Sequence, residues 1–270
     1  MMSEIPALLL DRATLRLGGK TLWSDLSLTV PRGEFLAVLG PNGSGKTSLL
    51  RTLLGLQSPD SGRVEVLGRV PRRGSQAVGY VPQQRAFDPD LPLRGRDLVA
   101  LGLNGHRWGS SLSPRGVHRR VDEMLALVGA RPYADAAIGR LSGGEQQRLR
   151  VAQALISDPQ ILLCDEPLLS LDLHYQQATV ELLADWNRRR SVTVVFVTHD
   201  INPALSAIDR VLLLAGGRWA AGTPDHALTS ETLSHLYGLP VEVLRIGGRV
   251  VVLGAELGGH APLPEHPAAV

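Results

Sequence analysis

The residues best suited to chemistry form a glycine-rich run that ends in lysine and threonine. Residues 40–47 read Gly-Pro-Asn-Gly-Ser-Gly-Lys-Thr, between an apolar run at 35–39 and leucines at helical spacing. Such a loop folds its backbone around an anion so that several N–H groups point inward, and the following helix adds partial positive charge. Lys46 can then reach the β- and γ-phosphates of a nucleoside triphosphate, and the Thr47 hydroxyl can ligate Mg²⁺. The residues expected to contact the nucleotide here are Gly40, Pro41, Asn42, Gly43, Ser44, Gly45, Lys46, Thr47 and Ser48.

Two adjacent carboxylates end a second apolar run and can complete such a site. Asp165 and Glu166 follow the apolar residues 161–164, which is typical of a core strand that delivers acids to its C-terminal edge. Open α/β sheets bind their ligands at that edge. We expect Asp165 to hold Mg²⁺, directly or through water, and Glu166 to orient or deprotonate the attacking water.

A third apolar run, at residues 192–197, ends in Thr198-His199-Asp200. Two interpretations of His199 stay open from the residues alone. It could contact the γ-phosphate of the nucleotide, or it could be a hydrogen-bonded structural residue, which is the commoner role of a histidine at a strand end.

A capping box opens a helix that precedes the two carboxylates. Ser142 stands three residues before Glu145, so each side chain can bond an otherwise unpaired N–H group at the helix start. That pattern alone describes only a capped helix. Gly143 and Gly144, however, weaken the first turn and leave bare amides that an anion could approach closely.

With these motifs in order, the chain resembles the ATP-binding subunits of ABC transporters across roughly residues 5–255. The resemblance makes 40–47 the Walker A motif, 141–145 the signature, 161–166 the Walker B motif and His199 the switch histidine. It implies an ATPase that uses ATP and Mg²⁺ and couples hydrolysis to transport across a membrane.

Two further motifs of the family match short stretches of the chain. Residues 79–83 resemble the Q-loop, whose Gln83 would sense Mg²⁺ and the attacking water, and residues 170–172 resemble the D-loop, whose Asp172 would cross to the partner subunit. The resemblance also implies a head-to-tail homodimer, in which each ATP lies between Walker A of one copy and the signature of the other. The implied catalytic residues are Lys46, Gln83, Glu166 and His199; the implied Mg²⁺ ligands are Thr47, Gln83 and Asp165; the signature residues acting in trans are Ser142, Gly143, Gly144 and Glu145.

One position departs from the family pattern. Many members stack the adenine ring on an aromatic residue just before the second strand, and aligning Gly18-Gly19-Lys20 with that loop puts Leu17 there. Trp23 falls where an aliphatic residue is usual. We expect it to be a core or subunit-contact residue and not a displaced stacking platform.

The composition is that of an ordinary globular chain. Its 270 residues, 44% of them hydrophobic, can hold one large domain or two small ones. No apolar run approaches the roughly 18–20 residues that a spanning helix needs, and residues 1–6 lack the features of a signal peptide. The single cysteine, Cys164, excludes an internal disulfide, suits a reducing compartment and is expected to be a buried small hydrophobe. We therefore expect a cytoplasmic chain, and the resemblance to ABC transporter subunits implies that it is bound peripherally to the inner face of the cell membrane.

Charge and aromatic content argue against a nucleic-acid partner. The net charge is only +2 and aromatic residues make up 4% of the chain. Basic clusters at 69–73, 115–120 and 188–190 are interrupted by glycine or proline or sit at a helix end. We expect them to be solvated faces.

The order of elements predicts an α/β fold with a flanking antiparallel β-sheet. The resemblance implies that its core is a P-loop NTPase core of the RecA type with an inserted α-helical subdomain. Alternating strands and helices at 160–222 indicate a parallel sheet with right-handed crossovers. We expect strands at 8–17, 26–30 and 62–68 in the flanking sheet, and helices at 94–103 and 114–129 in the insertion.

A C-terminal extension follows, with an expected helix over 225–237 and a hairpin that turns at Gly247-Gly248. The expected parts of the chain are 5–85 with 160–222 as the nucleotide-binding core, 86–159 as the helical subdomain with the signature, 223–255 as the extension, and 256–270 as a disordered tail.

Several short stretches resemble the ATPases of zinc and manganese importers, at 90–93, 96–102, 198–201, 236–238, 241–244 and 248–252. This resemblance implies import of a divalent metal ion through a separate membrane permease, supplied indirectly by an extracytoplasmic solute-binding protein. ATPases for iron-siderophore, haem or cobalamin uptake are the first alternative. Non-transport members of the family, in DNA repair or on the ribosome, are disfavoured because the chain has one Walker A, one signature and no heptad run.

Overall fold

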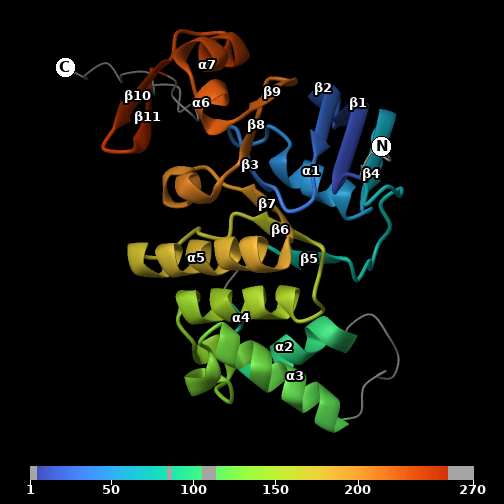
Figure 1. Ribbon diagram of the computed structural model, residues 1–270, viewed down its shortest axis with the longest axis vertical. Coiled ribbons are helices and arrows are strands. Elements are labelled where there is room, and N and C mark those ends of the chain that lie inside the picture. Colours follow the sequence, from blue (N-terminus) through green and yellow to red (C-terminus); the bar gives the residue numbers. More distant parts are fainter. Residues whose placement is uncertain (1–4, 84–86, 105–113, 255–270) are drawn as a thin grey trace, which may run out of the picture.

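The computed structural model describes residues 5–83, 87–104 and 114–254. Its centre is a six-stranded sheet built from β3 (Phe35–Leu39), β5 (Val78–Val81), β6 (Ile161–Asp165), β7 (Thr193–Val197), β8 (Arg210–Ala215) and β9 (Arg218–Gly222). The strands lie in the order β5-β6-β7-β3-β8-β9, and all neighbours are parallel except β9, which runs antiparallel to β8 (Figure 1). The expected parallel core of the α/β fold is therefore confirmed.

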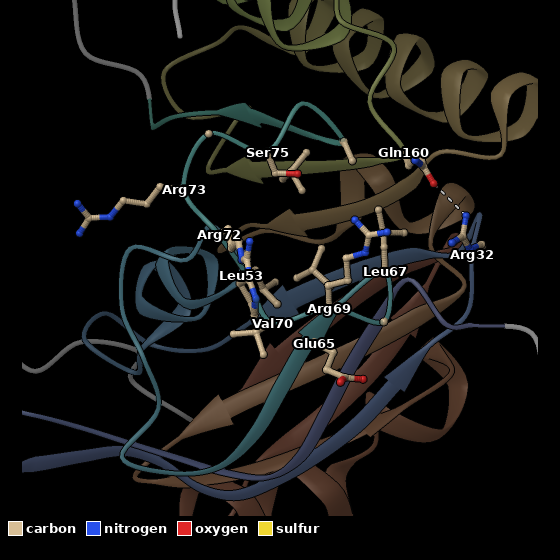
Figure 2. Close-up of a pocket in the computed structure, with 16 residues that line it drawn as sticks. Arg32, Leu53, Glu65, Leu67, Arg69, Val70, Arg72, Arg73, Ser75 and Gln160 are labelled. Carbon is tan, nitrogen blue, oxygen red and sulfur yellow. Dashed lines mark hydrogen bonds between the residues drawn. The ribbon is translucent and has the colours of Figure 1, made fainter. Parts of the chain in front are cut away.

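A three-stranded antiparallel sheet flanks this core, as expected. It is formed by β1 (Leu8–Leu17), β2 (Lys20–Val30) and β4 (Ser61–Val66), in the order β2-β1-β4. The strand expected over 62–68 ends earlier, at Val66. Leu67 and Gly68 both have positive φ, 54° and 72°, and this two-residue turn brings Arg69 back into backbone hydrogen bonds with Val66 (Figure 2).

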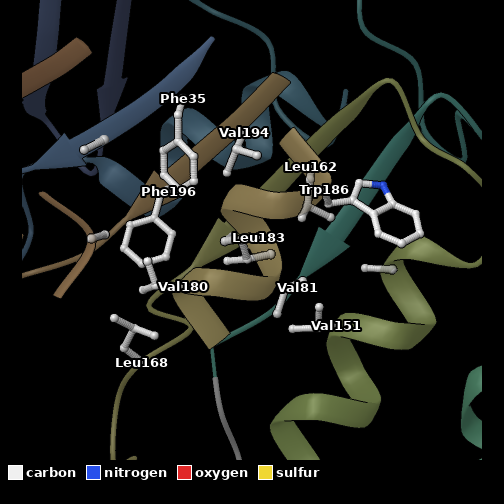
Figure 3. Close-up of a cluster of buried hydrophobic side chains, with 14 of the residues drawn as sticks. Phe35, Val81, Val151, Leu162, Leu168, Val180, Leu183, Trp186, Val194 and Phe196 are labelled. Atoms are coloured by element: carbon white, nitrogen blue, oxygen red, sulfur yellow. The ribbon is translucent and has the colours of Figure 1, made fainter. Parts of the chain in front are cut away.

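Alternate residues of the central strands pack into two different clusters. In β3, Phe35 and Ala37 belong to one cluster, and Leu36 and Val38 belong to the other. Successive side chains of a strand point to opposite faces, so both faces of the sheet are buried, as is usual for parallel strands. Figure 3 shows the first cluster, in which helix α5 (Leu173–Arg190) covers the sheet.

The second cluster joins the core to the flanking sheet. It combines the other face of the central strands with β1, β2, β4 and helix α1 (Lys46–Leu53). Trp23 of β2 is fully buried in this cluster, which agrees with the expectation of a core residue. Cys164 of β6 is also completely buried, on the other face of the sheet, and burial raises the pKa of its thiol.

Three helices lie together at one end of the molecule (Figure 1). They are α2 (Gly95–Asn104), α3 (Pro114–Leu127) and α4 (Gly143–Leu155). Helices α2 and α4 pack so closely that a Cβ added at Gly102 would lie 2.1 Å from the carbonyl oxygen of Gln153. Helix α3 ends two residues before the expected position, and Gly129 just beyond it has φ of 68°.

The C-terminal extension has two helices where one was expected. Helix α6 (Pro224–Ala227) ends at Leu228, whose φ and ψ of −94° and 67° leave the helical region. Thr229 then caps α7 (Ser230–Tyr237) by accepting a hydrogen bond from the backbone N–H of Thr232. The expectation of one continuous helix over 225–237 was wrong, because the cap at Thr229 starts a new helix.

The expected hairpin is confirmed as β10 (Glu242–Ile246) and β11 (Arg249–Leu253). Gly247 and Gly248 form its turn with φ of 56° and 76°. The expected loop at 104–109 and the tail from 256 lie largely outside the described residues. Among the described helices, none is both long and apolar enough to cross a membrane.

Candidate nucleotide-binding and catalytic site

Three adjacent strands of the core end at the same edge of the sheet. In the order β6-β7-β3, Asp165 is level with Val197, and Val38 is level with the same Val197. The glycine-rich loop after β3, the carboxylates that end β6 and the histidine after β7 are therefore brought together. This edge is where open α/β sheets bind their ligands.

Glycine is required at both ends of the loop. Gly40 has φ of 152°, and a Cβ there would lie 2.1 Å from the carbonyl oxygen of Leu214 in β8. Gly45 is the left-handed N-cap of α1, with φ of 100°, and a Cβ there would lie 2.9 Å from Leu22 and 3.1 Å from the indole ring of Trp23. The loop is thus held between β8 and β2 with no room for a side chain at either point.

Lys46 is folded back onto the loop that precedes it. It is only 8% exposed, and its ammonium group donates to the carbonyl oxygens of Gly40 at 2.6 Å and Pro41 at 3.1 Å. Burial lowers the pKa of Lys46, and the nearby carboxylates of Glu166 and Asp165 oppose that shift. The positive charge therefore lies within the concave face of the loop, where a phosphate chain would be held.

Thr47 and Asp165 form a pair of oxygen ligands. The Thr47 hydroxyl donates to Oδ1 of Asp165 at 3.3 Å, and Asp165 is 2% exposed. Burial raises the pKa of Asp165, while the hydrogen bond from Thr47 and the charge of Lys46 act in the opposite direction. A buried carboxylate beside a hydroxyl suits Mg²⁺, which binds oxygen ligands and is held in phosphate sites by one or two carboxylates. The two side chains fit the ion that the loop predicts.

Tyr80 of β5 is a neighbour of this pair that the sequence did not single out. Its own burial and the proximity of Asp165 raise the pKa of Tyr80 to about 12. The phenol therefore stays protonated and can donate a hydrogen bond to the carboxylate. No sequence signal would have found it, because the contact joins two neighbouring strands that are distant along the chain.

Glu166 and His199 are held as a pair. Oε2 of Glu166 lies 2.8 Å from Nδ1 of His199, with side-chain exposures of 13% and 60% respectively. The backbone of Glu166 is in the left-handed region, with φ of 50°, and its N–H donates to the carbonyl of Val197 at 3.0 Å. This strained turn aims the carboxylate across β7 toward the histidine. His199 is therefore hydrogen-bonded, as the structural interpretation expects, and a contact with the γ-phosphate stays a prediction.

A cavity of about 640 Å³ lies beside the first residues of the loop and the Glu166–His199 pair, and Lys46, Thr47 and Asp165 are not among its lining residues. Its lining combines the loop, both members of the carboxylate–histidine pair, the exposed Gln83 and apolar residues of the C-terminal extension. The lining residues from the predicted site are Gly40, Pro41, Asn42, Gln83, Glu166 and His199. Leu17, at the turn between β1 and β2, is 53% exposed and is not part of this lining.

The capping box at the start of α4 is present as predicted. The Ser142 hydroxyl accepts from the N–H of Glu145, and the Glu145 carboxylate accepts from the N–H of Ser142 at 2.9 Å. Gly144 is buried for a reason within this chain, because a Cβ there would lie 2.6 Å from the ring of Tyr175 in α5. Within the described part of the chain, no residue of 141–145 lines the cavity at the loop.

Asp172 has a local role as well. It is the N-cap of α5, and its Oδ1 accepts from the backbone N–H of Tyr175 at 2.9 Å. The next residue, Leu173, is 80% exposed. The cap fixes the start of α5 and leaves an apolar side chain on the surface beside it.

The fold and the site define a P-loop nucleoside triphosphatase. The family model described as "ABC transporter" matches residues 23–169, which include the loop, the capping box and the paired carboxylates. The chain belongs to the ABC transporter family and is an ATP-hydrolysing subunit of an importer.

Curated relatives match over most of this chain. The manganese transport system ATP-binding protein MntB of Bacillus subtilis is 35% identical, with 85% of this chain and 91% of the relative covered. The zinc transport system ATP-binding protein TroB of Treponema pallidum is 36% identical, with 88% and 90% covered. ATP-binding proteins named for import of hemin, Fe³⁺ ions, phosphonates and sulfate match to a similar degree.

A solved structure of a dimeric ATP-binding cassette, MJ0796 in a post-hydrolysis state with ADP and Pi, superposes with a TM-score of 0.69 and 28% identity. It covers 80% of this chain, and this chain covers 98% of it.

Proposed function

We propose that the chain powers import of a divalent metal ion, zinc or manganese, by hydrolysing ATP with Mg²⁺ at the edge of β3, β6 and β7. One observation supports the ATP site: neighbouring strand ends bring together Lys46, the Thr47–Asp165 pair and the Glu166–His199 pair. Bound Mg²⁺ supplies charge neutralisation at the β- and γ-phosphates.

Each residue of the site has a proposed role. Residues 40–48 bind the phosphates through the backbone N–H groups of all but Pro41 and through the ammonium of Lys46, while Thr47, Asp165 and Gln83 hold the cation. Glu166 orients or deprotonates the attacking water, and it lies within 2.8 Å of Nδ1 of His199, which can keep the carboxylate in place. Leu17 is the proposed adenine neighbour, so binding depends mainly on the phosphates.

We further propose a head-to-tail homodimer in which the signature acts in trans. Within the described part of one chain, residues 142–145 are outside the cavity that holds Asn42, Glu166 and His199, which supports a second copy as the source of that contact. The dimeric cassette MJ0796 lends further support. Asp172, already fixed as a helix cap, would approach the partner together with Leu173.

The remaining parts of the chain receive roles from the same proposal. Residues 86–159 would contact the membrane permease, and residues 5–85 with 160–222 would hold the nucleotide. Residues 223–255 form a C-terminal extension, and 256–270 a tail outside the described residues. The subunit would be cytoplasmic and peripheral on the inner face of the membrane, with the solute-binding protein acting on it only through the permease.

Relatives named for manganese and zinc transport support the metal-ion substrate. Import of haem is the alternative that a specific relative favours, the hemin import protein HmuV of Escherichia coli O157:H7, at 34% identity. Iron-siderophore and cobalamin importers share this alternative. The cargo never contacts the ATPase subunit, so the choice has to be tested by transport.

The first experiment tests the ATP site in the purified chain. Glu166→Gln should bind ATP, hydrolyse almost none of it and sediment as a dimer when ATP is saturating. Lys46→Ala is the matched control that should neither hydrolyse ATP nor dimerise. A Glu166→Gln chain that stays monomeric with saturating ATP would refute the shared site.

The second experiment tests the cargo. Vesicles that contain the subunit and its cognate permease should hydrolyse ATP faster when a Zn²⁺- or Mn²⁺-loaded binding protein is added outside, and metal should accumulate inside. Stimulation by haem, a ferric siderophore or cobalamin alone would reject the metal ion and leave the ATPase mechanism intact.

A further inference from the structure

A second pocket lies on the segment that joins β4 to β5. Its volume is about 890 Å³, and it is lined by residues 65–75 together with Arg32, Leu53, Ala77, Val78 and Gln160 (Figure 2). Pockets that bind small molecules commonly enclose about 300–1,000 Å³ and combine apolar walls with a few polar groups. This pocket has both components, as described below.

The charged component is an excess of guanidinium groups. Arg69 and Arg72 line the pocket and have no carboxylate partner among the described residues. Arg32 also lines it, and among the described residues its side chain donates to two neutral acceptors, the carbonyl of Ile5 at 3.1 Å and the side-chain amide of Gln160 at 2.9 Å. Within residues 5–83, 87–104 and 114–254, no carboxylate therefore pairs with these three guanidinium groups.

A carboxylate is present but already engaged. Glu65 lines the pocket and forms an ion pair with Arg63. Figure 2 shows the Glu65 carboxylate directed away from Arg69. It does not neutralise the guanidinium groups that line the pocket.

The backbone fixes where these arginines stand. Arg69 closes the two-residue turn after β4 through a pair of hydrogen bonds with Val66, at 2.8 and 3.1 Å. The backbone of Arg72 packs on the end of α1, since a Cβ added at Gly55 would lie 2.8 Å from its N and Cα atoms. A site whose backbone is already held loses less conformational entropy when a ligand binds.

The walls between the charges are apolar. Side chains of α1, of β4 and its turn, and of β5 provide them: Leu53, Val66, Leu67, Val70 and Val78. In Figure 2 the Arg69 side chain crosses the pocket, whereas Arg73 points away from it. Charge and apolar surface therefore face the same space.

We propose that this pocket binds a small phosphorylated molecule, with its phosphate groups on Arg69, Arg72 and Arg32 and its uncharged part on the apolar walls. Guanidinium groups suit phosphate because they present a planar set of N–H donors. The pocket lies at the opposite edge of the sheet from the catalytic residues, where β5 and β6 begin. It is a separate site from the nucleotide loop.

The test uses inorganic tripolyphosphate as the probe and calorimetric titration of the full chain without Mg²⁺. Wild type should bind tripolyphosphate at two classes of site, one at the loop and one in the pocket. Lys46→Ala should weaken the first class, and Arg69→Gln should weaken the second about tenfold, the loss expected for a charge-assisted contact. Arg73→Gln removes the same charge four residues along the chain, at the rim of the pocket, from a side chain that points away from it (Figure 2). It is the matched control, with no expected change in either class.

Basal ATP hydrolysis and the melting temperature should stay the same in Arg69→Gln and Arg73→Gln, because both side chains are exposed. A single class of binding in wild type, or equal weakening by Arg69→Gln and Arg73→Gln, would overturn the proposal. A separate arm with phosphatidylglycerol and phosphatidylcholine vesicles identifies the source of the phosphate. Selective loss of phosphatidylglycerol binding in Arg69→Gln would assign the pocket to a lipid headgroup.

Discussion

Substitution of Gly144 by alanine tests two explanations of the signature glycines at once. A Cβ at this position would lie 2.6, 2.6 and 2.8 Å from three ring carbons of Tyr175, against the roughly 3.5–4.0 Å at which carbon atoms pack. Overpacking of this kind costs about 1–3 kcal/mol, and alanine recovers up to about 1 kcal/mol of helix propensity. We expect a net loss of about 1–2 kcal/mol in the free energy of unfolding, or a few degrees in melting temperature.

A double-mutant cycle with Tyr175→Ala separates packing from function. Removing the ring should cancel most of the clash, so the loss of unfolding free energy in the double variant should be smaller than the sum of the losses in the two single variants. ATP hydrolysis should nevertheless stay low in the double variant if Gly144 also approaches the partner's nucleotide. Urea unfolding and steady-state ATPase assays measure the two effects. Gly144→Ala with unchanged stability would refute the packing argument, and full recovery of hydrolysis in the double variant would refute the role in trans.

Three further predictions concern the nucleotide loop, the buried acid and the C-terminal extension. Leu17→Tyr should tighten ATP binding by a few-fold, because stacking is worth about 1 kcal/mol, and wild type should hydrolyse GTP nearly as fast as ATP; a hundredfold preference for ATP in wild type would contradict this. Burial raises the pKa of Asp165 above its ordinary 3.8, so the folded chain binds this proton more tightly than the unfolded chain, and stability falls as the pH rises through that interval. Asp165→Asn should therefore raise the melting temperature of the nucleotide-free protein at pH 7 but not below pH 3.8, and it should abolish hydrolysis. A lower melting temperature of this variant at pH 7 would show that the carboxylate is stabilising. The Asn202 side chain hydrogen-bonds both backbone groups of Val250, at 2.8 and 3.0 Å. Since each lost bond costs roughly 1 kcal/mol, Asn202→Ala should speed amide exchange at Val250 by at least about tenfold. Unchanged exchange would refute the link.

Local patterns were enough to predict the core of the site. The glycines and Lys46 of the loop, the carboxylates after β6 and the capping box at Ser142 are set by neighbouring residues, and the structure has them in the predicted elements. The turn at Gly247-Gly248 is of the same kind, because its two residues both have positive φ, as a type I′ hairpin turn requires and as glycine allows. These features need no knowledge of distant contacts.

Contacts between distant segments could not be predicted. The position of Tyr80 beside Asp165 depends on the pairing of β5 with β6, and the packing of Tyr175 on Gly144 depends on how α5 crosses α4. The break between α6 and α7 was missed for a different reason. Apolar spacing continues across Leu228, and only its backbone conformation and the cap at Thr229 reveal that the helix stops.

The buried thiol of Cys164 makes this chain convenient for site-specific chemistry. It is the single cysteine of the sequence, it is completely enclosed, and its raised pKa keeps it in the unreactive protonated form. A cysteine introduced at an exposed position such as Glu181 of α5 would therefore be the one thiol open to a spin label, a fluorophore or a cross-linker. Distances between two copies could be measured directly in an otherwise native chain, without first replacing a residue of the central sheet.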